Sequence, residues 1–145
     1  MLEISRVDSW KAEQAVRWLQ LGEGIYALGI NEAPPYEINE SLRAALRCFE
    51  WGLELDPCNL DLLNELADHY GSGQGTEADE GMELRLICFA ALLGSARSQT
   101  ALGYVLSGGL KGTERIEQAI HWFRKAAIQG DEIAINALRK LSTSA

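Results

Sequence analysis

Apolar residues recur along the chain at the spacing of helices, and no segment shows sustained alternation with β-branched residues. The clearest example is the 0, 3, 4, 7, 11 pattern of one helical face, formed by Leu42, Ala45, Leu46, Phe49 and Leu53. Similar stripes predict seven helices, within residues 10–28, 42–53, 63–70, 84–93, 102–106, 116–127 and 134–141. The segment 84–93 is apolar nearly all round, which predicts a central and buried helix.

Residues that start and end helices stand between these stripes. Gly94 and Gly130 lie where helices would end in the left-handed conformation, and Pro57 stops the helix before it. Thr76 and Asp79 have the spacing of a capping box. Residues that favour helix N-termini precede five of the stripes, namely Asn39, Asn59, Thr76, Thr113 and Asp131. The long connections are then residues 29–38, 71–77 and 107–112.

The sequence repeats itself when it is shifted by 36 residues. The positions that coincide are Leu66 with Leu102, Ala67 with Gly103, Gly73 with Gly109, Ala90-Ala91 with Ala126-Ala127, and Gly94 with Gly130. Alanines let two helices approach closely and glycines end helices, so the shared positions have a structural meaning. One hairpin of this length cannot bury its own apolar face, whereas stacked hairpins bury a continuous core.

The pattern therefore predicts an all-α fold. Its architecture would be an α-α superhelix, a solenoid of about three antiparallel helical hairpins that ends in a C-terminal capping helix. A single domain is expected over 1–145, with hairpins at about 10–55, 59–94 and 96–129 and the cap at 131–142.

The last repeat carries a recognisable signature. Ala101-Leu102-Gly103 opens a helix, Gly108-Gly109 ends it, and the run from Trp122 to Asp131, WFRKAAIQGD, follows. This pattern resembles the Sel-one-like repeat (SLR), a relative of the tetratricopeptide repeat, over about 60–139. The copy before it has Leu86-Ile87 in place of the aromatic pair, and the first helix matches nothing specific. The resemblance implies a scaffold that binds other proteins.

The charge is unevenly distributed along the chain. Residues 1–80 contain 16 acidic and 5 basic side chains, whereas residues 81–145 contain 5 acidic and 8 basic ones. The formal net charge of −8 argues against nucleic-acid binding, which needs a basic face. An acidic half can steer a basic partner towards the protein, or it can simply keep the surface solvated. Both interpretations stay open at this point.

The sequence favours a cytoplasmic protein that does not enter a membrane. The chain starts with early acids and no apolar h-region, and no apolar run approaches the roughly 18 residues of a membrane span. Cys48, Cys58 and Cys88 are an odd number without CxxC spacing, which argues against a disulfide framework and against a structural zinc site. We expect Cys48 and Cys88 to be small buried residues in a reducing compartment.

Candidate chemistry is sparse. The segment 71–76 is rich in glycine, but no strand precedes it and no Lys-Ser/Thr follows, so it is not a phosphate loop. His69 and His121 are the only histidines, and neither has a second His or Cys at ligand spacing. The sequence therefore predicts no catalytic residues, no metal site and no cofactor, and a protein that is not an enzyme.

The leading hypothesis is a non-catalytic protein-interaction module that binds a partner, with a basic surface, through an acidic concave or N-terminal surface. Asp61, Glu65 and Asp68 share one helical face, and the tryptophans of the first helix, which has no hairpin before it, are potential anchors. The candidate partner-binding residues are Trp10, Arg17, Trp18, Gln20, Asp61, Glu65, Asp68, His69, Gln99 and Tyr104.

Two further hypotheses remain. The resemblance implies that the chain could be an immunity protein that neutralises a cognate bacterial toxin or secreted effector, because some small acidic repeat proteins of this family act in this way. Alternatively, the uncovered first helix could join copies of the chain into a homo-oligomeric scaffold.

Overall fold

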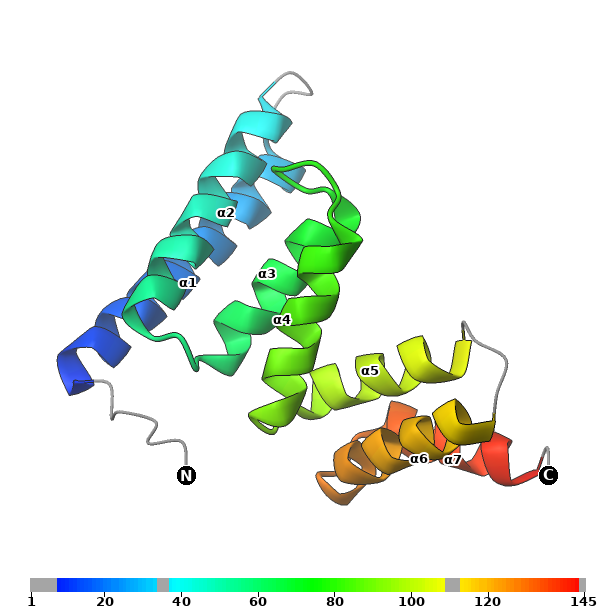
Figure 1. Cartoon of the computed structure of the whole chain (residues 1–145). Helices are drawn as coiled ribbons and strands as arrows, with labels where there is room; N and C mark the ends of the chain where they lie inside the picture. The colour runs from blue at the N-terminus through cyan, green and yellow to red at the C-terminus, as the bar shows by residue number, and fades with distance from the viewer. Residues whose placement is uncertain (1–7, 34–36, 109–112, 144–145) are drawn as a thin grey trace. The chain divides into compact units, whose positions relative to one another are not determined.

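The computed structural model describes residues 8–33, 37–108 and 113–143. Residues 34–36 of the predicted connection 29–38, and residues 109–112 of the predicted connection 107–112, lie outside the described ranges. Within these ranges the chain forms seven helices and no strand, which confirms the all-α prediction (Figure 1). The helices are α1 (Ser9–Asn31), α2 (Ile38–Leu55), α3 (Leu60–Ser72), α4 (Glu80–Leu92), α5 (Ala96–Gly108), α6 (Thr113–Ile128) and α7 (Glu132–Thr143).

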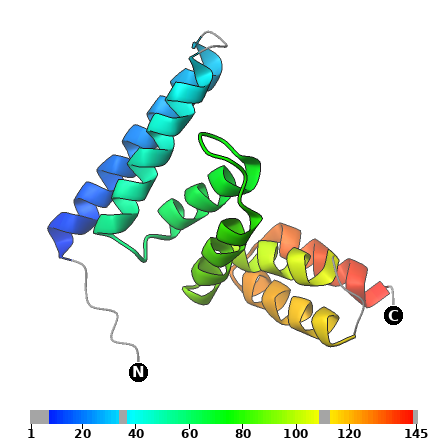
Figure 2. The same ribbon diagram turned by 45° about the horizontal axis from the view of Figure 1, so that its top comes forward.

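The helices form two compact units, Met1–Glu83 and Leu84–Ala145, and the boundary falls inside α4. In the first unit, α1 and α2 lie antiparallel and side by side, and α3 contacts α2 (Figure 2). In the second unit, α5 lies beside α6, and α7 packs against α6. Each pair is joined by a short connection, as expected for antiparallel neighbours.

The core of the first unit is built where α1 and α2 approach closely. Phe49 of α2 is fully buried, and its ring lies over Gly22 of α1. A Cβ atom added to Gly22 would lie only 2.5 Å from Cε1 of Phe49. At Gly29 a Cβ atom would lie 2.5 Å from the Cβ of Ser41. Glycine at these two positions therefore allows the two helix backbones to pack at short distance.

The second unit uses the same contact. Phe123 of α6 lies over Gly103 of α5, where an added Cβ atom would be 2.6 Å from Cε1 of the ring. The α1–α2 pair thus packs like the α5–α6 pair, although the sequence of α1 matches no specific repeat signature. Small residues complete the core around Phe123, and the buried cluster consists of Ala119, Phe123, Ala126, Ala134 and Ala137.

Two of the predicted N-caps are confirmed. The side chain of Asn59 accepts a hydrogen bond from the backbone N–H of Leu62 at 3.1 Å, and Asp131 accepts one from Ala134 at 2.9 Å. Asn39 is not a cap, because α2 already begins at Ile38. Thr113 is the first residue of α6 rather than its cap.

The predicted capping box at Thr76 is wrong, because α4 begins only at Glu80. Asp79 caps this helix instead, since its carboxylate accepts a hydrogen bond from the backbone N–H of Met82 at 2.9 Å. The glycine exits are confirmed: Gly94 and Gly130 have φ angles of 106° and 90°.

The prediction of a buried helix over residues 84–93 is also wrong. Only Ala90 and Ala91 are buried in α4, whereas Leu84, Phe89 and Leu92 are 40%, 42% and 74% exposed. An all-apolar helix has no polar side that fixes its orientation, so composition alone did not determine which residues are covered.

The cysteines are all free thiols. Cys48 is buried, as predicted, whereas Cys88 is only half-buried, so the expectation for Cys88 holds in part. Burial raises the pKa of both thiols above the ordinary value.

Candidate partner-binding surface

The connection between α3 and α4 folds back onto the end of α3. Gly73 ends that helix with a left-handed φ of 71°, and the backbone N–H of Asp79 donates to the carbonyl of Tyr70 at 2.8 Å. Gly75 has a φ of 77°, and an added Cβ atom would lie 2.5 Å from the carbonyl oxygen of Leu42. The glycine-rich segment is therefore a tight turn packed against the start of α2, and not a phosphate loop.

His69 ties this turn to the core of the first unit. Its Nδ1–H donates to the carbonyl of Gln74 at 2.9 Å, and the N–H of Gln74 donates back to the carbonyl of His69 at 3.0 Å. The ring packs edge-on against Tyr26 of α1 and Phe49 of α2, with centroids 5.4 and 5.2 Å away. Since His69 is only 2% exposed, the expectation that it lies on a partner-binding surface is wrong.

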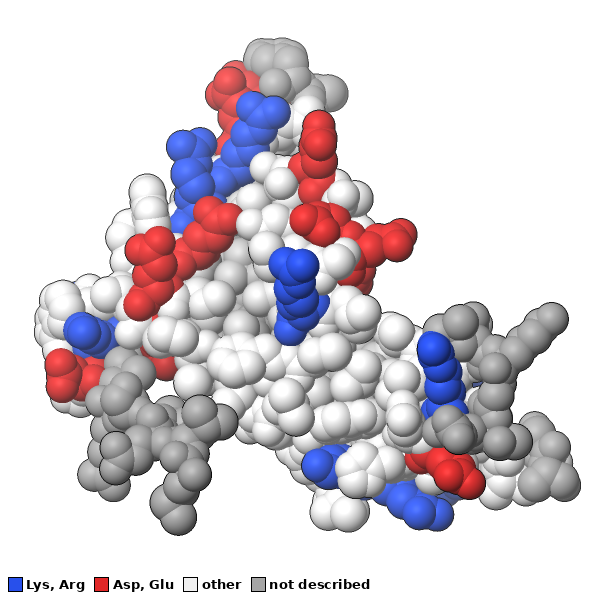
Figure 3. All heavy atoms as spheres, viewed as in Figure 1, with Lys and Arg blue, Asp and Glu red and all other residues white. Residues whose placement is uncertain are grey.

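The turn and α3 enclose an open, polar hollow of about 590 Å³. We refer to it as the acidic hollow, and its lining residues are Tyr70, Thr76, Glu77, Ala78, Asp79 and Glu80. Three of these six side chains are carboxylates, and all three are exposed. Acidic side chains are also spread over the helices of the first unit in the view of Figure 3.

Tyr70 links the hollow to α2. Its hydroxyl donates to Oε1 of Glu50 at 2.9 Å, across 20 positions of sequence. Burial, the hydrogen bond to Glu50 and the negative charges of Glu50 and Asp79 together raise the pKa of Tyr70. The rim of the hollow therefore holds a neutral phenol among carboxylates, an arrangement suited to a Lys or Arg side chain.

The acidic stripe predicted on α3 lies on the surface side of that helix. Asp61 and Asp68 are exposed and Glu65 is half-buried, while Leu62 and Leu66 face the core. Asp61, Glu65 and Asp68 thus share one face, as their spacing predicted. The stripe adds negative charge to the same unit that carries the acidic hollow.

The candidates on α1 divide into exposed and packed side chains. Trp10 is 62% exposed, and Arg17 and Gln20 of the same helix are also exposed. Trp18 is half-buried and packs edge-on against Trp51 of α2, with centroids 5.0 Å apart. Trp18 therefore contributes to helix packing in the first unit.

The candidates on α5 also divide. Gln99 is 4% exposed, so the expectation of a surface position is wrong. Its Nε2 donates to the carbonyl of Ala91 at 3.1 Å, and its Oε1 accepts from Nε2 of Gln129 at 2.9 Å, which joins α5 to the end of α6. Tyr104 is 47% exposed, with its ring 5.1 Å from that of Phe123.

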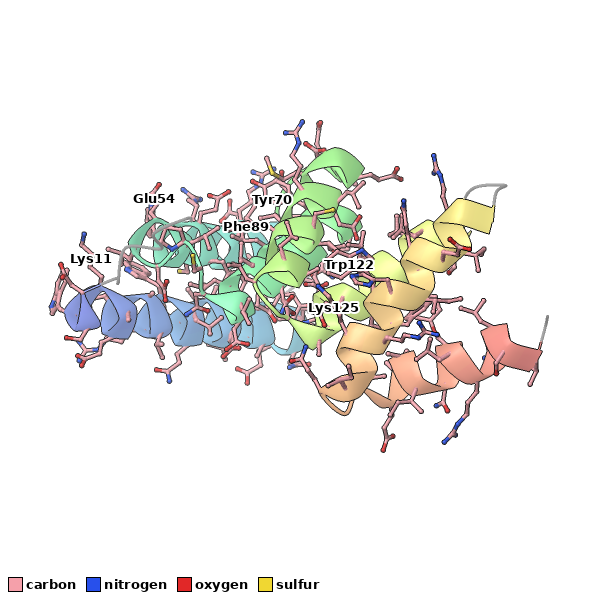
Figure 4. The ribbon with its side chains drawn as sticks, turned by 60° about the horizontal axis from the view of Figure 1, so that its bottom comes forward. Lys11, Glu54, Tyr70, Phe89, Trp122 and Lys125 are labelled. Atoms are coloured by element: carbon pink, nitrogen blue, oxygen red, sulfur yellow. The ribbon has the colours of Figure 1, made fainter. Side chains whose placement is uncertain are left out.

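Trp122 of α6 is half-buried. Lys125 lies one helical turn away on α6, and its Nζ is 4.9 Å from the centre of the indole ring (Figure 4). This cation–π contact covers the outer face of the ring.

The sequence reasoning missed the acidic hollow. A signal was present, because acidic residues at 77, 79 and 80 directly follow a glycine-rich turn. The contribution of Glu50 had no such signal, since only the packing of α2 against α3 brings it to Tyr70.

Among the described residues, no group of three or more His, Cys, Asp or Glu side chains is arranged to hold a metal ion. In the same part of the chain, none of the helices has the length and apolarity required for a membrane span.

The helical hairpins, with their Gly–Phe contacts and glycine exits, define a helical-repeat protein. The Sel1 repeat family model matches residues 61–82 and 96–131, which confirms the Sel-one-like resemblance over these residues. The fold is similar to the crystal structure of a Sel1 repeat protein from Oxalobacter formigenes, with a TM-score of 0.57 and 18% sequence identity. The match covers 86% of this chain and 56% of that one, and no curated protein matches the chain.

Proposed function

We propose that the chain is a non-catalytic interaction module that binds a basic segment of another protein in the acidic hollow. Sel1 repeat proteins are generally protein-interaction modules and are typically not catalysts. The observation that carries the proposal is the hollow itself, where Glu77, Asp79 and Glu80 surround Tyr70.

The geometry of the hollow favours a side chain with a cationic head. A Lys or Arg head group would find several carboxylates within one open concavity and a phenol ring on which its stem can lie. The turn that carries these carboxylates is already fixed by Gly73, Gly75 and His69, so binding requires little ordering of the loop. Exposed charges of this kind mainly increase the rate of association and fix the orientation of the partner.

The acidic stripe on α3 extends the same surface. Asp61 and Asp68 would attract further basic residues of the partner at longer range. Trp10, Arg17, Gln20 and Tyr104 remain candidates for contacts outside the hollow, because all four are exposed.

The test compares two variants with the same change of charge. Glu77→Lys/Glu80→Lys reverses two carboxylates of the hollow and leaves the helix cap at Asp79 intact. Glu32→Lys/Glu54→Lys reverses two exposed carboxylates near the C-terminal ends of α1 and α2, where a cation suits the helix dipole. Both variants and the wild type are used to capture partners from native lysate at low and physiological salt, with the captured proteins identified by mass spectrometry.

We expect a partner that the wild type and the Glu32/Glu54 variant retain and that the Glu77/Glu80 variant loses. Its affinity, remeasured with purified protein, should fall as salt rises, because exposed charge pairs are screened. Equal capture by all three proteins would exclude the hollow as the binding site. Equal loss from both variants would show that only the total charge matters.

A further inference from the structure

The hydroxyl of Tyr70 is oriented by a carboxylate that does not itself line the acidic hollow. Glu50 of α2 accepts the hydrogen bond from this hydroxyl at 2.9 Å, whereas the residues that line the hollow all lie within 70–80. A phenol has a single proton, and Tyr70 donates it to Glu50. The phenol oxygen is therefore left as a hydrogen-bond acceptor, and Glu50 acts on the hollow from outside it.

Asp79 provides a second acceptor near the phenol. Its negative charge reaches the hydroxyl, because burial, then Glu50, and then Asp79 raise the pKa of Tyr70. The backbone N–H of Asp79 donates to the carbonyl of Tyr70 at 2.8 Å, and its Oδ1 accepts from the N–H of Met82 at 2.9 Å. The carboxylate is thus held in place by the helix cap, so both acceptors are positioned before a ligand arrives.

Two fixed acceptors distinguish between the two basic side chains. An arginine guanidinium carries five N–H donors in a rigid planar fork, so it can bond to two acceptors at once while its flat face lies on an aromatic ring. A lysine ammonium is a compact, strongly hydrated point charge on a flexible stem. The exposed carboxylates of Glu77 and Glu80 attract both cations, so they do not discriminate between them.

We infer that the acidic hollow selects arginine over lysine, and that Glu50 sets this preference by orienting the hydroxyl of Tyr70. The inference rests on the proposed function, because it names the side chain that the hollow binds. Glu50 is a positioning residue, since it acts through Tyr70. Without the carboxylate of Glu50, the phenol proton turns towards the carboxylate of Asp79, and the two acceptors then occupy each other.

Two variants of Glu50 with the same change of charge separate orientation from electrostatics. Glu50→Gln keeps a carbonyl oxygen that can accept the phenol proton, whereas Glu50→Ala removes the acceptor. Both variants lose one negative charge, so a difference between them reports the orientation of the hydroxyl. Tyr70→Phe removes the hydroxyl and keeps the ring. Circular dichroism verifies that each variant is folded.

The probes are short peptides with blocked ends that differ in one central residue between glycines. This residue is arginine, lysine, or arginine dimethylated on one terminal nitrogen. An NMR titration of the isotope-labelled full-length chain at low salt follows the backbone amides of residues 73–81, which include the turn. We expect the wild type to bind the arginine peptide about two- to tenfold more tightly than the lysine peptide, as one additional hydrogen bond would give. Dimethylation keeps the charge but blocks the fork, so this peptide should bind no better than the lysine peptide.

The variants should divide according to the acceptor and not according to the charge. We expect Glu50→Gln to keep the preference for the arginine peptide. Glu50→Ala and Tyr70→Phe should lose the preference and still bind the lysine peptide, because the carboxylates of the hollow remain in place.

The possible failures are distinguishable. Equal binding of the arginine and lysine peptides by the wild type would overturn the inference and leave the proposed function standing. An equal preference in Glu50→Gln and Glu50→Ala would do the same, because it would show that Glu50 does not act through the hydroxyl. If no peptide shifts the amides of residues 73–81, the hollow binds no basic side chain, and the proposed function and the inference are both wrong.

Discussion

The close contact between Gly22 and Phe49 leads to a prediction that compares two glycine-to-alanine substitutions in α1. Gly24→Ala adds a methyl group where no atom lies within 4 Å, so it should gain the helix propensity of alanine, about 1 kcal/mol. Gly22→Ala brings the same gain in propensity. Its new Cβ, however, would lie 2.5, 2.8 and 3.0 Å from three atoms of the Phe49 ring.

The magnitude follows from the difference between the two variants. Carbon atoms pack best at about 3.5–4.0 Å, so the ring of Phe49 would have to move by about an ångström. Phe49 is fully buried, and overpacking of this kind costs about 1–3 kcal/mol. Because the propensity term cancels, Gly22→Ala should be less stable than Gly24→Ala by about 1–3 kcal/mol.

Urea unfolding followed by far-UV circular dichroism measures this difference in free energy of unfolding. With an m-value of about 1–3 kcal/mol/M, the two midpoints should differ by about 1 M. Introducing Gly22→Ala into a Phe49→Leu background provides a double-mutant cycle, and the smaller side chain should remove most of the cost. If Gly22→Ala proves as stable as Gly24→Ala, the close packing of α1 on α2 is incorrect.

Three further predictions concern a helix cap, a tyrosine and the cysteines. Asn59→Ala should lower the free energy of unfolding by about 1 kcal/mol, because α3 loses its capping oxygen; an unchanged urea midpoint would contradict this. Tyr70 should titrate above the ordinary tyrosine value of about 10, because burial and then Glu50 raise its pKa. The raised pKa of Tyr70 therefore stabilises the fold below pH about 10, and this stabilisation is lost as the pH rises through the raised pKa. The difference in alkaline absorbance between wild type and Tyr70→Phe reports the titration of Tyr70. Glu50→Gln should lower the pKa of Tyr70. Cys48 should be alkylated more slowly than Cys58 in the folded protein, since Cys48 is buried and its pKa is raised. Equal alkylation rates, measured by mass spectrometry, would contradict the burial of the Cys48 side chain in α2.

The sequence predicted the elements of the fold well, because helical periodicity and caps are local properties. The apolar stripe over residues 42–53 correctly predicted which face of α2 is buried. Asn59 and Asp131 cap the helices that follow them, as their residue types predicted. The left-handed exits at Gly94 and Gly130 also followed from residue type alone. All of these features depend on neighbours within about one helical turn.

The positions of polar side chains were harder to predict, although part of the signal was present. His69 follows Leu62 and Leu66 at the spacing of one helical face, so its register already placed it in the core. Gln99 precedes Leu102 in the same way on α5. The helical register of the apolar stripes, applied to polar residues as well, predicts that His69 and Gln99 are both buried.

Features that depend on two distant segments could not be predicted. The hydrogen bond between Tyr70 and Glu50 requires that α2 and α3 meet at a particular depth. The exposure of Phe89 and Leu92 depends on which side of α4 is covered, and an all-apolar helix does not encode that choice.

His69 holds the turn between α3 and α4, and this contact has a thermodynamic consequence. The ring of His69 is held between Tyr26 and Phe49, so the turn keeps its shape only while that part of the core is intact. A partner that binds only the folded hollow therefore raises the melting temperature of the first unit by mass action. By the same linkage, a substitution that loosens the core beneath His69 weakens partner binding without touching a contact residue. Thermal unfolding of the protein would then report on partner occupancy even before the partner's own binding site is known.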